Sequence, residues 1–245
     1  MSSEPTVGKT SLAGPTPTPE APAGKAYRGA AMEGSIARWY ARTRGTGSQI
    51  AEWRSQAERV ARDLAPGAEI LEVAPGPGYF ALELARLGRY RVTGLDVSHT
   101  FVEIATENAR REGLTVSFRQ GDAAAMPFPA ASFDLVLCQA AFKNFSRPQT
   151  AVNEVYRVLR PGGTALIEDM RREATNEAID EEVRGMMLGS LRAWMTRRAL
   201  RSLRRRAYTV DQFRGFAAAS PFGSGQVETS RIGVELRLRR PLSAA

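Results

Sequence analysis

Cysteine and histidine are almost missing from this chain of 245 residues. Cys138 is the only cysteine and His99 the only histidine. A single cysteine excludes an intramolecular disulfide framework and suits a reducing compartment, so we expect a cytoplasmic protein. His99 falls at the expected start of a helix, which makes it a poor candidate for acid–base chemistry.

Long apolar runs and lysines are also scarce. No apolar run reaches membrane-spanning length, so we expect no membrane partner. The net charge of +8 hints at an anionic partner, but Lys9, Lys25 and Lys143 are the only lysines among the 34 basic residues. An arginine bias of this kind can follow from GC-rich coding, and nucleic acid is not the partner we favour. The oligomeric state stays open, a homodimer included.

The composition changes sharply near residue 27. Residues 1–26 are rich in Pro, Ser, Thr, Ala and Gly and lack the apolar stretch of a secretory signal, which predicts a disordered tail. Residues 27–245 are predicted to form a single domain. Within it we expect a helical cover over 27–64, a core over 65–172, a helical lid insertion over 173–207, and a C-terminal helix and β-hairpin over 208–245.

Strands and helices alternate through the predicted core. Apolar runs predict strands over 69–73, 91–95, 115–119, 133–138 and 164–168, each separated from the next by a helix or loop. Such alternation indicates an α/β fold with a doubly wound, mostly parallel sheet that has helices on both faces.

The first of these strands runs into a glycine turn that contains Gly76 and Gly78. Glycine allows the backbone to approach a bound nucleotide closely and to adopt positive φ. Glu72 places a carboxylate just before this turn. That carboxylate would repel a diphosphate and attract a cofactor with a cationic amino group and no phosphate. S-adenosylmethionine (SAM) is such a cofactor.

Two more carboxylates follow the next strands. Asp96 ends the second strand, at a spacing from the turn that suits binding of ribose hydroxyls. Gly121 and Asp122 follow the third strand, where a carboxylate can accept a hydrogen bond from an adenine amino group. Ligands of open parallel sheets bind beyond the carboxyl ends of the strands, so we expect these side chains to share one site.

Taken together, these motifs resemble those of class I, Rossmann-like SAM-dependent methyltransferases. The resemblance covers roughly residues 65–170 and is carried by residues 71–78, 95–96, 121–122, 126–128, 133–136 and 158–163. It implies that Glu72 and the turn hold the methionine moiety, Asp96 the ribose and Asp122 the adenine. Pro75 and Pro77 depart from the common pattern and would stiffen the turn. The cofactor-binding residues expected from the resemblance are Glu72, Ala74, Gly76, Gly78, Asp96, Val97, Gly121, Asp122, Ala123 and Gln139.

A dinucleotide-binding domain is the alternative reading of the turn, because Gly76, Gly78 and Ala81 formally fit its fingerprint. Glu72, Asp122 and the motif at 160–163 argue against NAD or FAD.

Methyl transfer is an in-line displacement in which alignment of the acceptor supplies much of the catalysis. The sequence names no convincing general base. Weak candidates for positioning the acceptor are Lys143, Asn144, Arg171 and Tyr40. Lys143 and Arg171 would suit an acceptor with an anionic group. The chain lacks the carboxylate cluster of metal-dependent, catechol-type methyltransferases, so we predict no metal.

We therefore expect methyl transfer to an oxygen, nitrogen or carbon atom of a small molecule. One alternative is an RNA or protein methyltransferase that docks through the arginine-rich segment 197–206. Another is a non-catalytic module that binds SAM.

Overall fold

A computed structural model describes residues 27, 32–45 and 47–242. The tail predicted over 1–26 lies outside these described residues. The described chain forms one seven-stranded sheet with helices on both faces, which confirms the predicted fold class.

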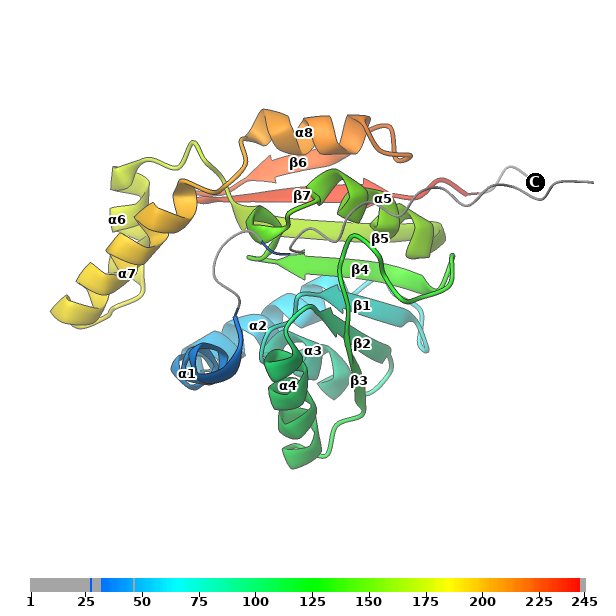
Figure 1. Ribbon diagram of the computed structural model, residues 1–245, viewed down its shortest axis with the longest axis horizontal. Helices are drawn as coiled ribbons and strands as arrows, with labels where there is room; N and C mark the ends of the chain where they lie inside the picture. Colours follow the sequence, from blue (N-terminus) through cyan, green and yellow to red (C-terminus); the bar gives the residue numbers. More distant parts are fainter. Residues whose placement is uncertain (1–26, 28–31, 46, 243–245) are drawn as a thin grey trace, which may run out of the picture.

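The strands lie in the order β3-β2-β1-β4-β5-β7-β6 (Figure 1). Strands β1 to β5 are parallel, whereas β7 is antiparallel to both β5 and β6. The winding reverses between β1 and β4, where ligands of such sheets bind. The strands are β1 (Glu69–Val73), β2 (Arg91–Asp96), β3 (Val116–Gln120), β4 (Phe133–Gln139), β5 (Leu159–Met170), β6 (Gln226–Thr229) and β7 (Gly233–Arg239).

Helices cover the two faces of the sheet in two groups. Helices α2 (Gly47–Val60) and α3 (Tyr79–Arg86) pack on one face, with α4 (His99–Arg111) beside them over β2 and β3. Helices α5 (Pro148–Val158) and α8 (Val210–Ala218) cover the other face. Helix α1 (Gly34–Thr43) contacts α4.

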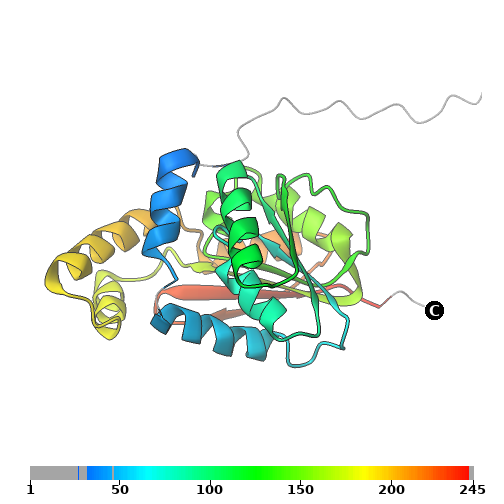
Figure 2. The same ribbon diagram turned by 90° about the horizontal axis from the view of Figure 1, so that it is seen from below.

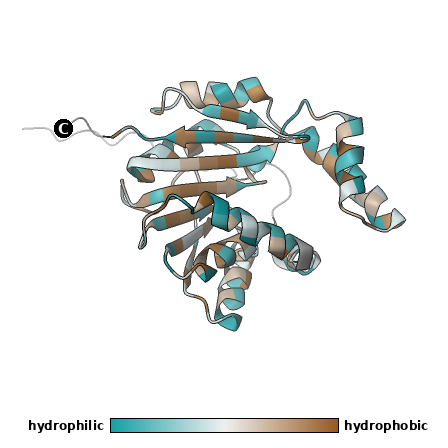
Figure 3. Cartoon of the chain, turned by 180° about the vertical axis from the view of Figure 1, so that it is seen from behind, coloured by the Kyte–Doolittle hydropathy of each residue, from teal (hydrophilic) through white to brown (hydrophobic). Residues whose placement is uncertain are grey.

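Side chains along β1 point alternately to the two faces of the sheet, so the strand contributes to the hydrophobic core on each face. Ile70 packs with α2 and α3, while Leu71 and Val73 point to the opposite face, with α5 and α8. Glu72 shares the face of Ile70, because side chains two residues apart lie on one side of a strand. The central strands β1, β4 and β5 are mostly buried, as expected for strands covered on both faces. Strands β3, β6 and β7 mix polar and apolar residues (Figure 3).

One strand starts earlier than the sequence indicates. We expect the fifth strand to begin at Thr164, after a turn at residues 160–163, but β5 begins at Leu159. The register of β5 on β4 shifts between Phe133 and Leu135, which accommodates the extra residues as an irregularity in the strand. The backbone N–H of Gly162 donates to the carbonyl of Arg240, 2.9 Å away, so the C-terminal segment pairs with the residues expected to form the turn.

Helices α6 (Asn176–Gly185) and α7 (Ser190–Arg204) form a hairpin that projects from the body of the molecule (Figure 1). The buried side chains of α6 are Ile179 and Val183. The hairpin lies beyond the same end of the sheet as α1 (Figure 2), where we predict a lid. None of the described helices is both long and apolar enough to cross a lipid bilayer.

Candidate functional site

The structure buries Glu72 at the centre of the sheet, between β2 and β4. Its carboxylate accepts a hydrogen bond from the backbone N–H of Ala81 in α3. The Oε2 atom has no hydrogen-bond partner among the described residues. Burial, the Ala81 hydrogen bond and the nearby Asp96 together set the pKa of Glu72 at about 8, with burial the largest cause of the rise. An unpartnered, buried carboxyl group of this kind would be stabilised as an anion by a cationic ligand.

The turn after β1 has a left-handed backbone at three positions: Ala74 (φ 58°), Gly76 (φ 55°) and Gly78 (φ 81°). A Cβ atom on Gly78 would lie 2.8 Å from both Ala105 and Phe118, so the glycine is needed for close packing. A Cβ atom on Gly76 would meet no described atom within 4 Å, so the backbone is open there. Ala74 adopts the left-handed conformation at a cost of roughly 1 kcal/mol, and this strain lies next to Glu72.

Asp96, at the end of β2, fixes the turn from the side. Its Oδ2 accepts the N–H of Gly76 at 2.9 Å, and its Oδ1 accepts the N–H of Ser98 at 2.9 Å. Burial raises the pKa of Asp96 to about 6, although these hydrogen bonds oppose the rise. Val97, the next residue, is partly exposed. The turn and the second carboxylate therefore form one connected unit.

Asp122 lies after β3, as expected, but it has a partner that the sequence did not suggest. Its Oδ1 accepts the N–H of Ala124 at 2.8 Å, and its Oδ2 lies 2.7 Å from Nη2 of Arg147, which precedes α5. Gly121 donates its N–H to the carbonyl of Asp96 at 2.9 Å, which joins the ends of β2 and β3. Ala123 packs at the edge of the core.

Gln139, at the end of β4, directs its amide to Glu168 of β5, with Nε2 3.2 Å from Oε2. Gln56 of α2 donates to the same oxygen at 2.8 Å. Burial and the nearby Glu235 raise the pKa of Glu168. Sequence reasoning missed Glu168, and the available signal was its position at the carboxyl end of a parallel strand.

Lys143 is buried, and its Nζ lies 2.7 Å from Oδ1 of Asp169. It also donates to the carbonyl of Ala140. A lysine is rarely buried without a charged partner, and here that partner is Asp169, near the carboxyl end of β5. The role of Lys143 in positioning an acceptor stays a prediction.

Three other candidates for acceptor positioning differ in their surroundings. Arg171 donates to the carbonyls of Ser230 and Arg231, at 3.3 and 3.0 Å, and so binds the turn between β6 and β7. Asn144 is buried, and its Oδ1 has no hydrogen-bond partner among the described residues. Tyr40 is half-buried on α1. All three residues stay predictions for this role.

The N-terminal part of the described chain lies over the carboxyl edge, meaning the edge formed by the carboxyl ends of β1 to β5. Glu33 accepts hydrogen bonds from the backbone N–H groups of His99 and Thr100, which fixes the start of α1 to the start of α4. Tyr27 pairs with Phe145 in an isolated β-bridge. Burial raises the pKa of Tyr27, and Asp96 contributes to the rise.

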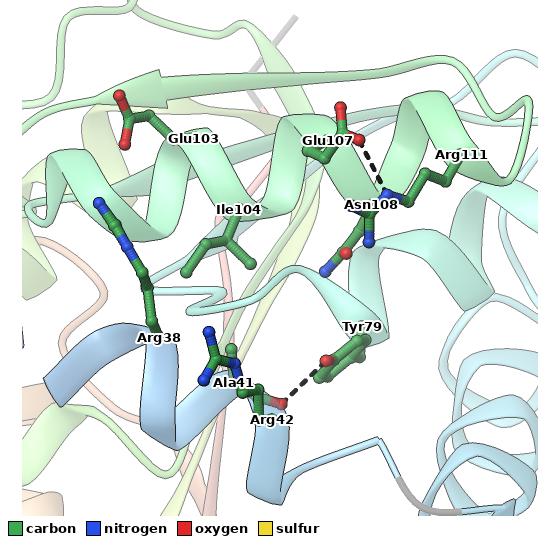
Figure 4. A pocket seen from close by; sticks show the side chains of 9 residues that line it. All are labelled: Arg38, Ala41, Arg42, Tyr79, Glu103, Ile104, Glu107, Asn108 and Arg111. Atoms are coloured by element: carbon green, nitrogen blue, oxygen red, sulfur yellow. Dashed lines mark hydrogen bonds and ion pairs between the residues drawn. The ribbon is translucent and has the colours of Figure 1, made fainter. Parts of the chain in front are cut away.

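A cavity of about 390 Å³ lies between α1 and α4, on the outer side of the turn (Figure 4). Tyr79 donates its hydroxyl to the carbonyl of Ala41 at 3.0 Å, and Asn108 donates to the carbonyl of Pro77 at 3.0 Å. The three carboxylates do not line this cavity. Its contacts hold α1 and α4 against the turn.

The geometry fits a cofactor that carries a cation and a nucleoside without phosphates. Glu72, Asp96 and Asp122 end or follow β1, β2 and β3, which are neighbours in the sheet. A parallel sheet of this order, with carboxylates at these three strand ends, defines the class I SAM-dependent methyltransferase fold.

The comparisons with known proteins agree with this class. Residues 71–167 match the family model described as "Methyltransferase domain". This match confirms, for that segment, the resemblance drawn from the sequence.

Curated relatives match about half of the chain. The chain is 40% identical over 116 residues to the demethylmenaquinone methyltransferase of Thermus thermophilus, which covers 47% of this chain and 52% of the relative. It is 36% identical over 105 residues to the ubiquinone/menaquinone biosynthesis C-methyltransferase UbiE of a Ruegeria species, with 42% of each chain covered. The chain thus spans about half the length of the curated relatives it matches.

Solved structures extend the likeness over most of the fold. A putative SAM-dependent methyltransferase from Methanococcus maripaludis superposes with a TM-score of 0.69 at 18% identity, over 91% of this chain and 100% of the other. The plantazolicin methyltransferase BpumL superposes with a TM-score of 0.62 at 13% identity, over 84% of this chain and 89% of the other. Likeness at these identities concerns the fold alone.

Proposed function

We propose that this protein transfers the methyl group of SAM to a small-molecule acceptor. The observation that carries the proposal is the buried Glu72 carboxyl group, whose Oε2 lacks a partner among the described residues and lies beside a glycine turn. SAM supplies the electrophilic methyl group when bound. Glu72 would hold the cationic methionine portion, Asp96 would accept hydrogen bonds from the ribose hydroxyls, and Asp122 would accept one from the adenine amino group.

The acceptor we propose is an aromatic carbon of a quinone-like molecule. Two of the relatives named above act on menaquinone or ubiquinone precursors according to their names. The protein's own contribution would be alignment of the acceptor under the covering helix α1. We keep Lys143, Asn144, Arg171 and Tyr40 as the candidates for that alignment. The ion pair of Lys143 with Asp169 and the hydrogen bonds of Arg171 to Ser230 and Arg231 favour Asn144 and Tyr40 among them.

We also propose a cytoplasmic setting. Cys138 is a buried free thiol, and burial raises its pKa, so it is held as an unreactive thiol.

Binding and transfer need separate measurements, because one structural neighbour is titled a [4+2]-cyclase. Calorimetric titration with SAM and S-adenosylhomocysteine, with NAD as the control, tests the cofactor. We expect micromolar binding of the first two and none of NAD. Transfer of a labelled methyl group to a short-chain demethylmenaquinone then tests the acceptor. Cofactor binding without transfer to this or other aromatic acceptors would favour a non-catalytic SAM-binding module. Salt-sensitive transfer to RNA would favour an RNA methyltransferase that docks through the arginine-rich segment 197–206.

A pair of alanine substitutions tests where the cofactor lies. Gly76 and Gly88 both have a left-handed backbone, and an added Cβ would meet no described atom within 4 Å at either position. Each change should destabilise the fold by about 1 kcal/mol. Only Gly76→Ala should also weaken SAM binding, by about tenfold or more, since the cofactor would approach the backbone at the turn. Equal calorimetric affinities in the two variants would contradict the placement.

A further inference from the structure

The hairpin of α6 and α7 exposes an unusual set of apolar side chains at its free end. Met187 is 92% exposed, Leu191 71% and Trp194 59%. Isolated exposed apolar residues are common, but a contiguous group marks an interaction site. We call this group the apolar tip; its members are Met186, Met187, Leu191, Trp194 and Met195.

The arginines of α7 fall into two sets. Arg197 and Arg201 pair with Asp180 of α6, and Arg204 donates to the carbonyl of Ala174, so these three hold the hairpin together. Other arginines of the segment point to solvent. The exposed arginines are Arg192, Arg198, Arg205 and Arg206.

Helical spacing places exposed arginine and apolar residues on one face. Leu191, Met195 and Arg198 follow one another at intervals of four and three residues, and Arg205 continues the same face two turns later. Arg198 has no ion-pair partner within the described part of the chain, and Asp180 is already engaged by Arg197 and Arg201. The face is therefore apolar toward the tip and cationic toward the body.

Helix α1 presents a similar surface beyond the same edge of the sheet (Figure 2). Trp39 is 64% exposed and Ile36 52%, and Arg38 and Arg42 are exposed on the same helix. Thus two elements that flank the carboxyl edge both carry exposed apolar side chains and arginines, and the arginines of α1 line the cavity between α1 and α4 (Figure 4).

We propose that the apolar tip and the exposed face of α1 dock onto the surface of an anionic lipid bilayer. Tryptophan, leucine and methionine beside arginine are the side chains that partition at such a surface: the rings and alkyl groups enter the headgroup boundary and the guanidinium groups meet lipid phosphates. A second copy of the chain fits less well, because a two-fold contact would bring the same arginines together. Nucleic acid fits less well because it offers no apolar layer for the tip.

Docking in this way would turn the carboxyl edge toward the bilayer. The inference goes beyond methyl transfer and does not require it. The expectation of no membrane partner rests on the lack of a membrane-spanning segment. The proposal keeps that lack and adds binding at the membrane surface.

Vesicle co-sedimentation of the full chain tests the proposal, with phosphatidylcholine vesicles compared with vesicles that also contain phosphatidylglycerol. We expect binding to the anionic vesicles that falls with salt. The double variant Leu191→Asp with Trp194→Asp should weaken binding about tenfold or more, and Arg198→Gln should weaken it several-fold, to about one fifth. Met187→Ser, at the most exposed position, tests the tip with a minimal risk to folding.

Matched controls lie at the opposite end of the molecule. Leu242 is 74% exposed, and Arg239 is exposed at the end of β7. Leu242→Asp and Arg239→Gln should leave vesicle binding unchanged, and circular dichroism should show every variant folded. The proposal is overturned by a lack of binding to anionic vesicles, by equal losses in the controls, or by a concentration-dependent dimer that the double variant abolishes.

Discussion

Glu72→Gln is expected to stabilise the cofactor-free protein at alkaline pH and, at the same time, to weaken SAM binding. The pKa of Glu72 is raised from 4.5 to about 8, chiefly by burial. The folded state therefore holds a proton that the unfolded state releases, and the stability from this group is lost as pH rises through 8. The slope should approach about 1.4 kcal/mol per pH unit between the two pKa values. Glutamine carries no charge at any pH and removes this loss.

Urea denaturation at pH 5.5, 7.0 and 8.5 measures the effect. The advantage of the variant over the wild type in free energy of unfolding should grow by on the order of 3 kcal/mol from the lowest to the highest of these pH values. Binding gives an independent readout. The wild type should release about one proton when it binds SAM at pH 7, measured by calorimetry in buffers of different ionisation enthalpy, and the variant should not. A variant with unchanged affinity and proton release would refute the role of Glu72.

Asp96→Ala is expected to weaken SAM binding by about 100-fold or more. The ribose of SAM would lose its charge-assisted hydrogen bonds to this carboxylate, each worth about 1.5–3 kcal/mol. Its removal also frees the N–H of Gly76, which it holds at 2.9 Å. Isothermal titration with SAM measures the loss.

Asp134→Ala is the matched control for this change. Asp134, at the amino end of β4, also accepts a backbone N–H, that of Glu69. Unlike Asp96, it pairs in addition with a side chain, that of Arg160. Its loss should lower the melting temperature but leave the affinity for SAM within about twofold of the wild type. If both variants lost affinity alike, the effect of Asp96 would be general destabilisation.

The sheet and the turn were predictable because their signals are local. Alternating apolar runs set the parallel strands, and glycines with a preceding carboxylate located the turn at the end of β1. The pairings of charged side chains were not predictable. Lys143 with Asp169 and Arg147 with Asp122 each join residues about 25 positions apart in the chain, and nothing in the spacing shows which acid a long basic side chain will reach.

The backbone strain at the turn was not predictable from the sequence either. Ala74 carries a left-handed φ of 58°, a conformation that its residue type does not signal. The solvent exposure of Trp39 and Trp194 was likewise invisible, because apolar residues at helical spacing usually indicate a packed face. These features depend on which helices lie next to each other.

The position of β7 has a consequence for synthesis of the protein. β7 lies between β5 and the edge strand β6 in the sheet, yet α6, α7, α8 and β6 all lie between β5 and β7 in the chain. While the ribosome makes those segments, the backbone N–H and C=O groups on the edge of β5 that later binds β7 have no partner strand and can pair with other chains. The nascent protein would therefore depend on protection of that edge, by a chaperone or by speed of translation, until β7 emerges.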